Sequence, residues 1–237
     1  MLRSTAIILS VTLLGWPMAG QPQARIKYLQ HSGYVGDIEN PADVDRAALR
    51  DARRLARLGN IDAQYNTGAM YHALGKIDTA VYWYRRAALF RHPLAAYNLG
   101  QLYYEGQFMP RDLDEARHWM QVAGEAGYPP AQTYLAQMAY RNELPESGPE
   151  AEFEWYRRAA LQGGVIAQFN LGILFWKGQG VERDPVRAYA WMSLAAEELG
   201  EEAAAADIAR SLSATEREDA EALAAELAGE IRPFVMR

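Results

Sequence analysis

Apolar residues recur along the chain at the three- and four-residue spacing that is typical of amphipathic helices. In AQFNLGILFWKG, four apolar residues stand at positions i, i+4, i+7 and i+8: Ala167, Leu171, Leu174 and Phe175. This spacing places them on one face of a helix. A glycine-rich loop follows, and DPVRAYAWMSLAAEELG then has the pattern of a second helix, with Asp184 suited to its N-cap. The pattern predicts two helices joined by a short loop.

The helix pair recurs with a fixed period. Four of the six tryptophans stand 36 residues apart, at Trp83, Trp119, Trp155 and Trp191. The motif A-x-[YTF]-[NY]-x-[GA] marks the first helix of each pair and begins at Ala63, Ala95, Ala131 and Ala167. It ends in a small residue although glycine lowers helix propensity, at Gly68, Gly100, Ala136 and Gly172. We therefore expect a repeat array whose paired helices approach closely at the small residue, and whose repeated tryptophans lie in the core.

The fourth unit shows the full motif of the array. It reads A-x-x-N-L-G-x-x-[YF]-x-x-G-x-G-V-x-x-D-x-x-x-A-x-x-W-x-x-x-A-A from Ala167. This pattern resembles the Sel-one-like repeat (SLR), which is related to the tetratricopeptide repeats. The resemblance covers residues 47–228 and implies an all-α fold, a right-handed α/α superhelical solenoid of helix pairs. The other units depart from the motif in their loops, where the second unit has Phe108 and Met109 and the first is four residues shorter.

The array predicts the organisation of the whole chain. We expect a signal peptide at 1–20, cleaved between 19 and 24, and a linker at 21–40. An N-terminal half-repeat at 41–61 precedes four repeats, at 62–94, 95–130, 131–166 and 167–202. Residues 203–231 are expected to form C-terminal capping helices, with Ser213 and Glu216 spaced for a capping box. Their many glutamates suit the polar outer face of a terminal cap.

The first residues have the pattern of an export signal. Arg3 precedes an apolar run from Ala6 to Trp16, and small residues follow at positions 19, 20 and 24. The run is shorter than the roughly 20 residues of a membrane-spanning helix. We therefore expect an exported protein that has no integral membrane span after cleavage, in the periplasm rather than in the medium. An uncleaved signal anchor is the alternative.

Composition argues against several functions. The net charge is −6 and the cations are scattered, which argues against nucleic acid as a partner. The absence of cysteine excludes a disulfide framework, a thiolate nucleophile and a cysteine zinc site. None of the four histidines lies three or four residues from another, and common serine hydrolase motifs are missing. We expect no catalytic residue, no metal and no cofactor, and hence a protein that is not an enzyme.

The first helices of successive units line one surface of a solenoid, and we expect binding there. Beside the core positions, a second face of these helices carries the predicted groove residues: Tyr65, His72, Tyr97, Gln101, Tyr104, Glu105, Gln137, Tyr140, Arg141, Phe169, Trp176 and Lys177. One row of this face is aromatic in all four units, at His72, Tyr104, Tyr140 and Trp176. Rings with polar neighbours suit a peptide or a glycan. The alternative is that the rings only close the packing between adjacent first helices.

The resemblance and the aromatic face together predict a non-catalytic adaptor, a scaffold for protein–protein interaction with a concave aromatic groove. Its partner would be another envelope or secreted protein, bound as an extended peptide or as a helix. The alternative is a glycan-binding module that uses the same groove for cell-wall or exopolysaccharide chains, because sugars stack on aromatic rings.

Overall fold

The computed structural model describes residues 44–106 and 109–235. Within these ranges the chain has no strand and forms eleven helices: α3 (Arg46–Arg57), α4 (Ile61–Ala73), α5 (Ile77–Ala88), α6 (Pro93–Glu105), α7 (Leu113–Glu125), α8 (Pro129–Tyr140), α9 (Pro149–Leu161), α10 (Val165–Lys177), α11 (Pro185–Leu199), α12 (Glu202–Ala209) and α13 (Ala214–Glu230). The predicted signal peptide and linker lie outside the described residues. The all-α fold that the sequence predicts is confirmed.

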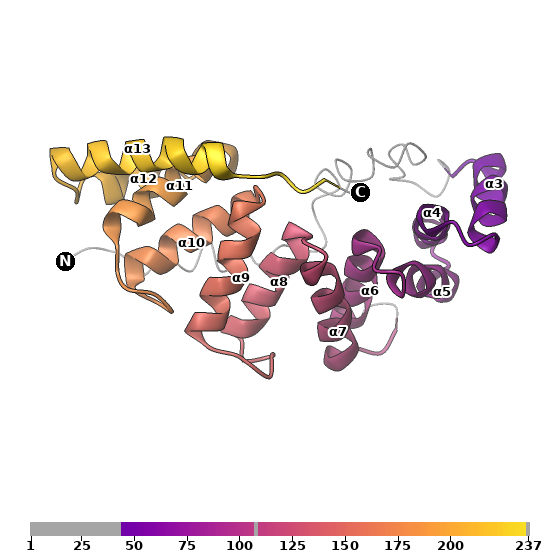
Figure 1. Ribbon diagram of the computed structural model, residues 1–237. Helices are drawn as coiled ribbons and strands as arrows, with labels where there is room; N and C mark the ends of the chain where they lie inside the picture. The colour runs from indigo at the N-terminus through magenta and orange to yellow at the C-terminus, as the bar shows by residue number, and fades with distance from the viewer. Residues whose placement is uncertain (1–43, 107–108, 236–237) are drawn as a thin grey trace. The chain divides into compact units, whose positions relative to one another are not determined.

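The chain divides between Ala126 and Gly127 into two compact units, each a run of helix pairs (Figure 1). In residues 44–126, α3 packs against α4, and the pairs α4–α5 and α6–α7 follow, with α5 against α6. In residues 127–235, the pairs are α8–α9 and α10–α11, with α9 against α10, and both α12 and α13 pack on α11. Most helices therefore pack on their neighbours in sequence, as in an α/α solenoid.

In the three pairs whose first helix has a glycine at the small position, that glycine lies against the second helix of the same pair. A Cβ atom added to Gly172 would lie 2.4 Å from Cγ of Met192 and 2.8 Å from the carbonyl oxygen of Ala188. One added to Gly100 would lie 3.0 Å from Cγ of Met120. In both pairs the residue after the repeated tryptophan therefore occupies the space of the missing side chain. The close approach expected from the glycines is confirmed in these pairs.

Three of the four repeated tryptophans lie in the core, as expected. Trp83, Trp119 and Trp191 are buried, whereas Trp155 is only half-buried. The guanidinium of Arg158 covers the ring of Trp155, with Cζ 4.9 Å from the ring centroid. The buried Trp83 has the same kind of cation–π contact, with Cζ of Arg86 5.6 Å from its ring centroid.

Side-chain caps fix where several helices begin. The carboxylate of Asp184 accepts a hydrogen bond from the backbone N–H of Arg187 (2.9 Å) at the start of α11. At the start of α13, Glu216 N–H donates to the Ser213 hydroxyl (3.2 Å) and Ser213 N–H donates to the Glu216 carboxylate (2.8 Å). Such contacts satisfy backbone donors that have no partner within the helix. Both caps agree with the sequence-based expectation.

Across the described stretches of chain, no helix combines the length and the apolar character that crossing a bilayer requires.

Candidate functional site

The predicted aromatic row lies in the last turn of four first helices. Tyr140 is the last residue of α8, and each of the other three is the second-last residue of its helix: His72 in α4, Tyr104 in α6 and Trp176 in α10. Each of these rings is at least partly exposed, and Tyr140 is exposed by 55%. The row thus places two partly accessible rings on residues 44–126 and two on residues 127–235.

Two of the four rings carry an arginine side chain on one face. The guanidinium carbon of Arg111 lies 5.0 Å from the ring centroid of Tyr104, and that of Arg183 lies 4.6 Å from the ring centroid of Trp176. In both cases the arginine Nε also donates to the backbone carbonyl of the aromatic residue, at 3.0 Å. The arginine is therefore held over the ring by a cation–π contact and by a hydrogen bond.

The loop after each of these helices brings the arginine back to the ring. The helix ends in the left-handed region, at Gly106 (φ 61°) and Gly178 (φ 69°), where glycine is favoured. The backbone N–H of Asp112 then donates to Tyr103 (3.0 Å), and the N–H of Asp184 donates to Phe175 (2.9 Å). These matching bonds close both loops in the same way.

Arg111 and Arg183 are not among the binding residues that the sequence pattern predicts. A signal for them exists, because the loops read GQFMPRD and GQGVERD and share a glycine, a glutamine and a final Arg-Asp at the same spacing. The shared contacts persist although Met109 replaces the valine of the motif in the second unit. The first and third units lack this loop sequence.

The other two rings of the row have different surroundings. His72 lies beside Tyr84, with its Nδ1 3.5 Å from the tyrosine hydroxyl and the two rings edge to face. Tyr140 precedes the loop RNELPESGPE, which has no counterpart in the other units. The row is therefore not uniform, and the two rings backed by arginine are alike.

Four of the predicted groove residues are buried. Tyr65, Tyr97, Gln101 and Phe169 are each exposed by 8% or less. Tyr65 stacks on His92 with 4.7 Å between ring centroids, and the Gln101 amide donates to the Tyr97 hydroxyl at 2.9 Å. These positions face neighbouring helices, so their side chains contribute packing and offer little surface to a partner. For them the structure corrects the prediction of a groove-lining role.

The remaining predicted groove residues are accessible beside the row. Glu105 and Gln137 are partly exposed, and Arg141 and Lys177 are exposed. Arg141 and Lys177 each follow a ring of the row directly in sequence, at Tyr140 and Trp176. Together with Arg183, they place positive charge next to the rings of residues 127–235.

A buried histidine lies between the first and second repeats. His92 caps α6, and its Nδ1 accepts a hydrogen bond from the N–H of Ala95 at 3.2 Å. Burial lowers the pKa of His92 to about 4, although Asp62, 3.5 Å from Nε2, acts in the opposite direction. The unfolded chain therefore binds this proton more tightly, so stability is lost as the pH falls from about 6.5 to 4. The geometry assigns His92 a structural role.

A buried carboxylate occupies the first turn of α9. Glu152 accepts a hydrogen bond from the Gln179 amide at 2.7 Å, across to the loop after α10. Burial raises its pKa from 4.5 to about 7, while the bond with Gln179 and the charge of Lys177 act to lower it. The folded protein therefore binds this proton more tightly than the unfolded chain. Stability contributed by the protonated form is present below pH 4.5 and is lost as the pH rises through 7.

Neither of these groups belongs to a cluster of metal-ligating side chains within the described residues. In the parts of the chain that the structure describes, no three side chains of the His, Asp and Glu types gather as metal ligands would. His92 packs between helices, whereas Glu152 lies near the row, where its charge interacts with that of Lys177, the residue after Trp176. The arrangement at the row offers instead flat rings, guanidinium donors and ammonium charge, which are suited to binding.

Comparison with known proteins agrees with the geometry. The family model of the Sel1 repeat matches residues 61–89, 93–128, 129–164 and 165–198. No curated protein matches the chain. Proteins built from these repeats generally serve as scaffolds for protein interaction.

Two solved structures are similar. One is c5321, a protective antigen of uropathogenic Escherichia coli strains that displays an SLR fold. It is 26% identical over 90% of this chain and 47% of that chain, with a TM-score of 0.69. The other, a Sel1 repeat protein from Oxalobacter formigenes, is 27% identical over 81% of this chain and 77% of that chain, with a TM-score of 0.58. The chain thus spans about half the length of the Escherichia coli protein.

The family matches cover more than half of the chain, and the helices pair as these repeats require. The chain therefore belongs to the Sel1 repeat family.

Proposed function

We propose that this protein is a non-catalytic adaptor that binds a protein segment, an extended peptide or a helix, at the aromatic row. The observation that carries the proposal is the arginine held over each of Tyr104 and Trp176. Tyrosine, tryptophan and arginine are the residues that most often dominate binding energy at protein interfaces. A ring already held by an arginine also loses little side-chain freedom when a partner binds.

The charges beside the rings favour a partner with acidic side chains. Arg183 and Lys177 flank Trp176, and Arg141 follows Tyr140. An acidic residue of the partner would pair with these cations while an apolar neighbour lies on a ring. Surface charges of this kind mainly raise the association rate and the specificity.

We propose further that the protein is exported and meets another envelope or secreted protein, in the periplasm. The support is the charged start, apolar run and small residues of the first 24 positions. A glycan is the second candidate ligand, and the specific observation in its favour is that the ring of Tyr140 is exposed and the indole of Trp176 is partly exposed. Flat, exposed rings suit the apolar faces of sugars as well as peptide side chains.

The test is affinity capture from an envelope extract with the full chain as bait. A variant that combines Tyr104→Ala, Tyr140→Ala and Trp176→Ala removes the accessible rings. Tyr82→Ala is a matched control, since Tyr82 on the second helix α5 is exposed by 52% and Tyr140 by 55%. Circular dichroism checks that each bait keeps its helices.

The proposal expects a protein that the original chain and the Tyr82→Ala bait retain and that the triple variant loses. Equal capture by all three baits would place binding elsewhere and contradict it. Binding that survives protease treatment of the extract would contradict a protein ligand and favour the glycan.

A further inference from the structure

Helix α3 presents a continuous arginine face. Its five arginines are Arg46, Arg50, Arg53, Arg54 and Arg57. At about 100° per residue, they fall within an arc of about 100° on the side of the helix away from Ala52 and Ala56. These two alanines are buried, and α3 packs against α4. Arg46, Arg50, Arg54 and Arg57 are exposed, and Arg53 is partly exposed.

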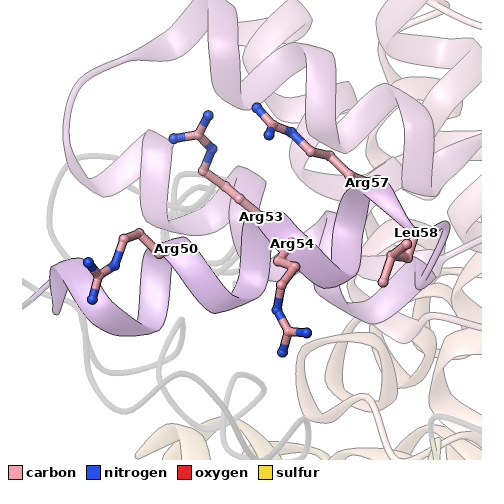
Figure 2. A pocket seen from close by; sticks show the side chains of 5 residues that line it. All are labelled: Arg50, Arg53, Arg54, Arg57 and Leu58. Atoms are coloured by element: carbon pink, nitrogen blue, oxygen red, sulfur yellow. The ribbon is translucent and has the colours of Figure 1, made fainter.

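Helix α3 contains one acidic residue, Asp51, and no ion pair joins it to these guanidinium groups. Among the described residues, none of the five arginine side chains makes an ion pair or a side-chain hydrogen bond. Figure 2 shows four of them leaving α3 along its length, where together with Leu58 they line an open hollow. Asp45 is engaged instead as the N-cap, accepting from the N–H of Ala47 at 2.8 Å.

The last helix presents the opposite charge. On α13, Ala220 is buried, while five acidic residues are exposed: Glu218, Asp219, Glu221, Glu226 and Glu230. None of these five carboxylates forms an ion pair within the described parts of the chain. The preceding segment adds further acidic residues at 197, 198, 201 and 202.

The charge of the chain is distributed unequally between its two compact parts, residues 44–126 and residues 127–235. Residues 44–126 contain eleven Lys and Arg against nine Asp and Glu, whereas residues 127–235 contain nine against eighteen. The acidic excess of the protein therefore belongs to residues 127–235, and the arginine face of α3 belongs to residues 44–126. Segregation of this kind favours contacts between unlike ends of different molecules.

We propose that the arginine face of α3 docks against the five exposed acidic residues of α13 of a second copy of this chain, which span about half of the helix circumference. The dimensions agree. At about 1.5 Å per residue, the row from Arg46 to Arg57 is about 17 Å long, and that from Glu218 to Glu230 is about 18 Å long. Each copy of the chain carries both surfaces, so the two surfaces are always present in equal amounts.

The contact is head to tail, so it leaves one basic face and one acidic face unused in each pair. Such heterologous contacts produce rings or open chains rather than closed twofold dimers. Terminal helices of a repeat array normally carry a polar outer face that keeps the array soluble. Here the exposed arginines of α3 and the exposed acidic residues of α13 are polar and complementary in charge. This surface is distinct from the aromatic row and does not depend on it.

Sedimentation velocity of the full chain, over a range of protein concentration and at 20 and 500 mM NaCl, tests the proposal. Association should be evident at low salt and weaken about tenfold or more at high salt, since exposed ion pairs are screened. Two charge-reversed variants follow. One carries Arg50→Glu, Arg53→Glu, Arg54→Glu and Arg57→Glu, and the other carries Glu218→Lys, Glu221→Lys, Glu226→Lys and Glu230→Lys.

Each reversed variant alone has two ends of like charge and should stay monomeric at low salt. An equimolar mixture should associate again, because each variant then meets an end of opposite charge. This rescue also shows that both variants are folded. A monomeric original chain at low salt, or a mixture that fails to associate while circular dichroism shows intact helices, would overturn the proposal. Association of either variant alone to the original extent would overturn it as well.

Discussion

The contact between α10 and α11 makes a quantitative prediction for Gly172→Ala. The new methyl group would lie 2.4 Å from Cγ of Met192, which a flexible side chain can relieve, and 2.8 Å from the backbone oxygen of Ala188, which it cannot. The two helices must therefore separate by several tenths of an ångström. Overpacking of this kind costs about 1–3 kcal/mol, and alanine returns up to about 1 kcal/mol of helix propensity. We expect a net loss of about 1–2 kcal/mol.

Thermal unfolding followed by circular dichroism measures this loss. For a chain of this size it corresponds to a fall in Tm of about 3–6 °C. Gly229→Ala is the matched control, because Gly229 is also helical but has no atom within 4 Å of an added Cβ. That substitution should raise stability by up to about 1 kcal/mol.

The two substitutions are chemically identical and differ only in the space around the new methyl group. If Gly172→Ala were as stabilising as Gly229→Ala, the α10–α11 contact would not be the reason for the small residue in the repeat. The same conclusion would follow if the loss of stability caused by Gly172→Ala were no larger than that of a substitution at an exposed position without close contacts.

Three further predictions concern buried charge and the aromatic row. Glu152→Gln should raise the free energy of unfolding by about 2–3 kcal/mol at pH 8 and hardly change it at pH 4, because the new amide keeps a partner in Gln179 and has no charge to desolvate. Urea titrations at the two pH values measure this difference. An equal effect at both pH values would contradict the prediction. His92→Asn keeps an N-cap acceptor and should flatten the fall in Tm between pH 6.5 and 4; an unchanged slope would assign the acid sensitivity to another group. Arg183→Ala should weaken binding of the captured partner by about threefold or more, as loss of a cation–π contact predicts; an unchanged Kd would show that the arginine does not support the ring.

Much of the fold follows from local sequence rules. The period of 36 residues, the apolar stripes and the caps at Asp184 and Ser213 are properties of a few neighbouring residues. Helix geometry converts such spacing into a face without knowledge of the rest of the molecule. Gly100 and Gly172 also predicted a tertiary contact, because a glycine that lowers helix propensity indicates close contact of the helix with another element.

The candidate site was predicted only in part. A helical wheel separates the face of Tyr65 and Phe169 from the core face, yet both residues are buried. Tyr65 stacks on His92, which belongs to the next repeat. A wheel describes angles about one helix axis, so it does not show that a neighbouring repeat covers a second face.

The sequence by itself thus determined the helices, their order and their pairing, because these depend on local spacing and on contacts between adjacent segments. Only the tertiary structure decided which rings are covered, which arginine lies on which ring, and that Glu152 is buried. Arg111 and Arg183 each follow their aromatic ring by seven residues in the sequence. They reach the ring because a glycine in the left-handed region changes the direction of the chain after the helix. Burial and ring contacts of this kind depend on the path of the loop and on the adjacent repeat, and neither is a property of a single helix.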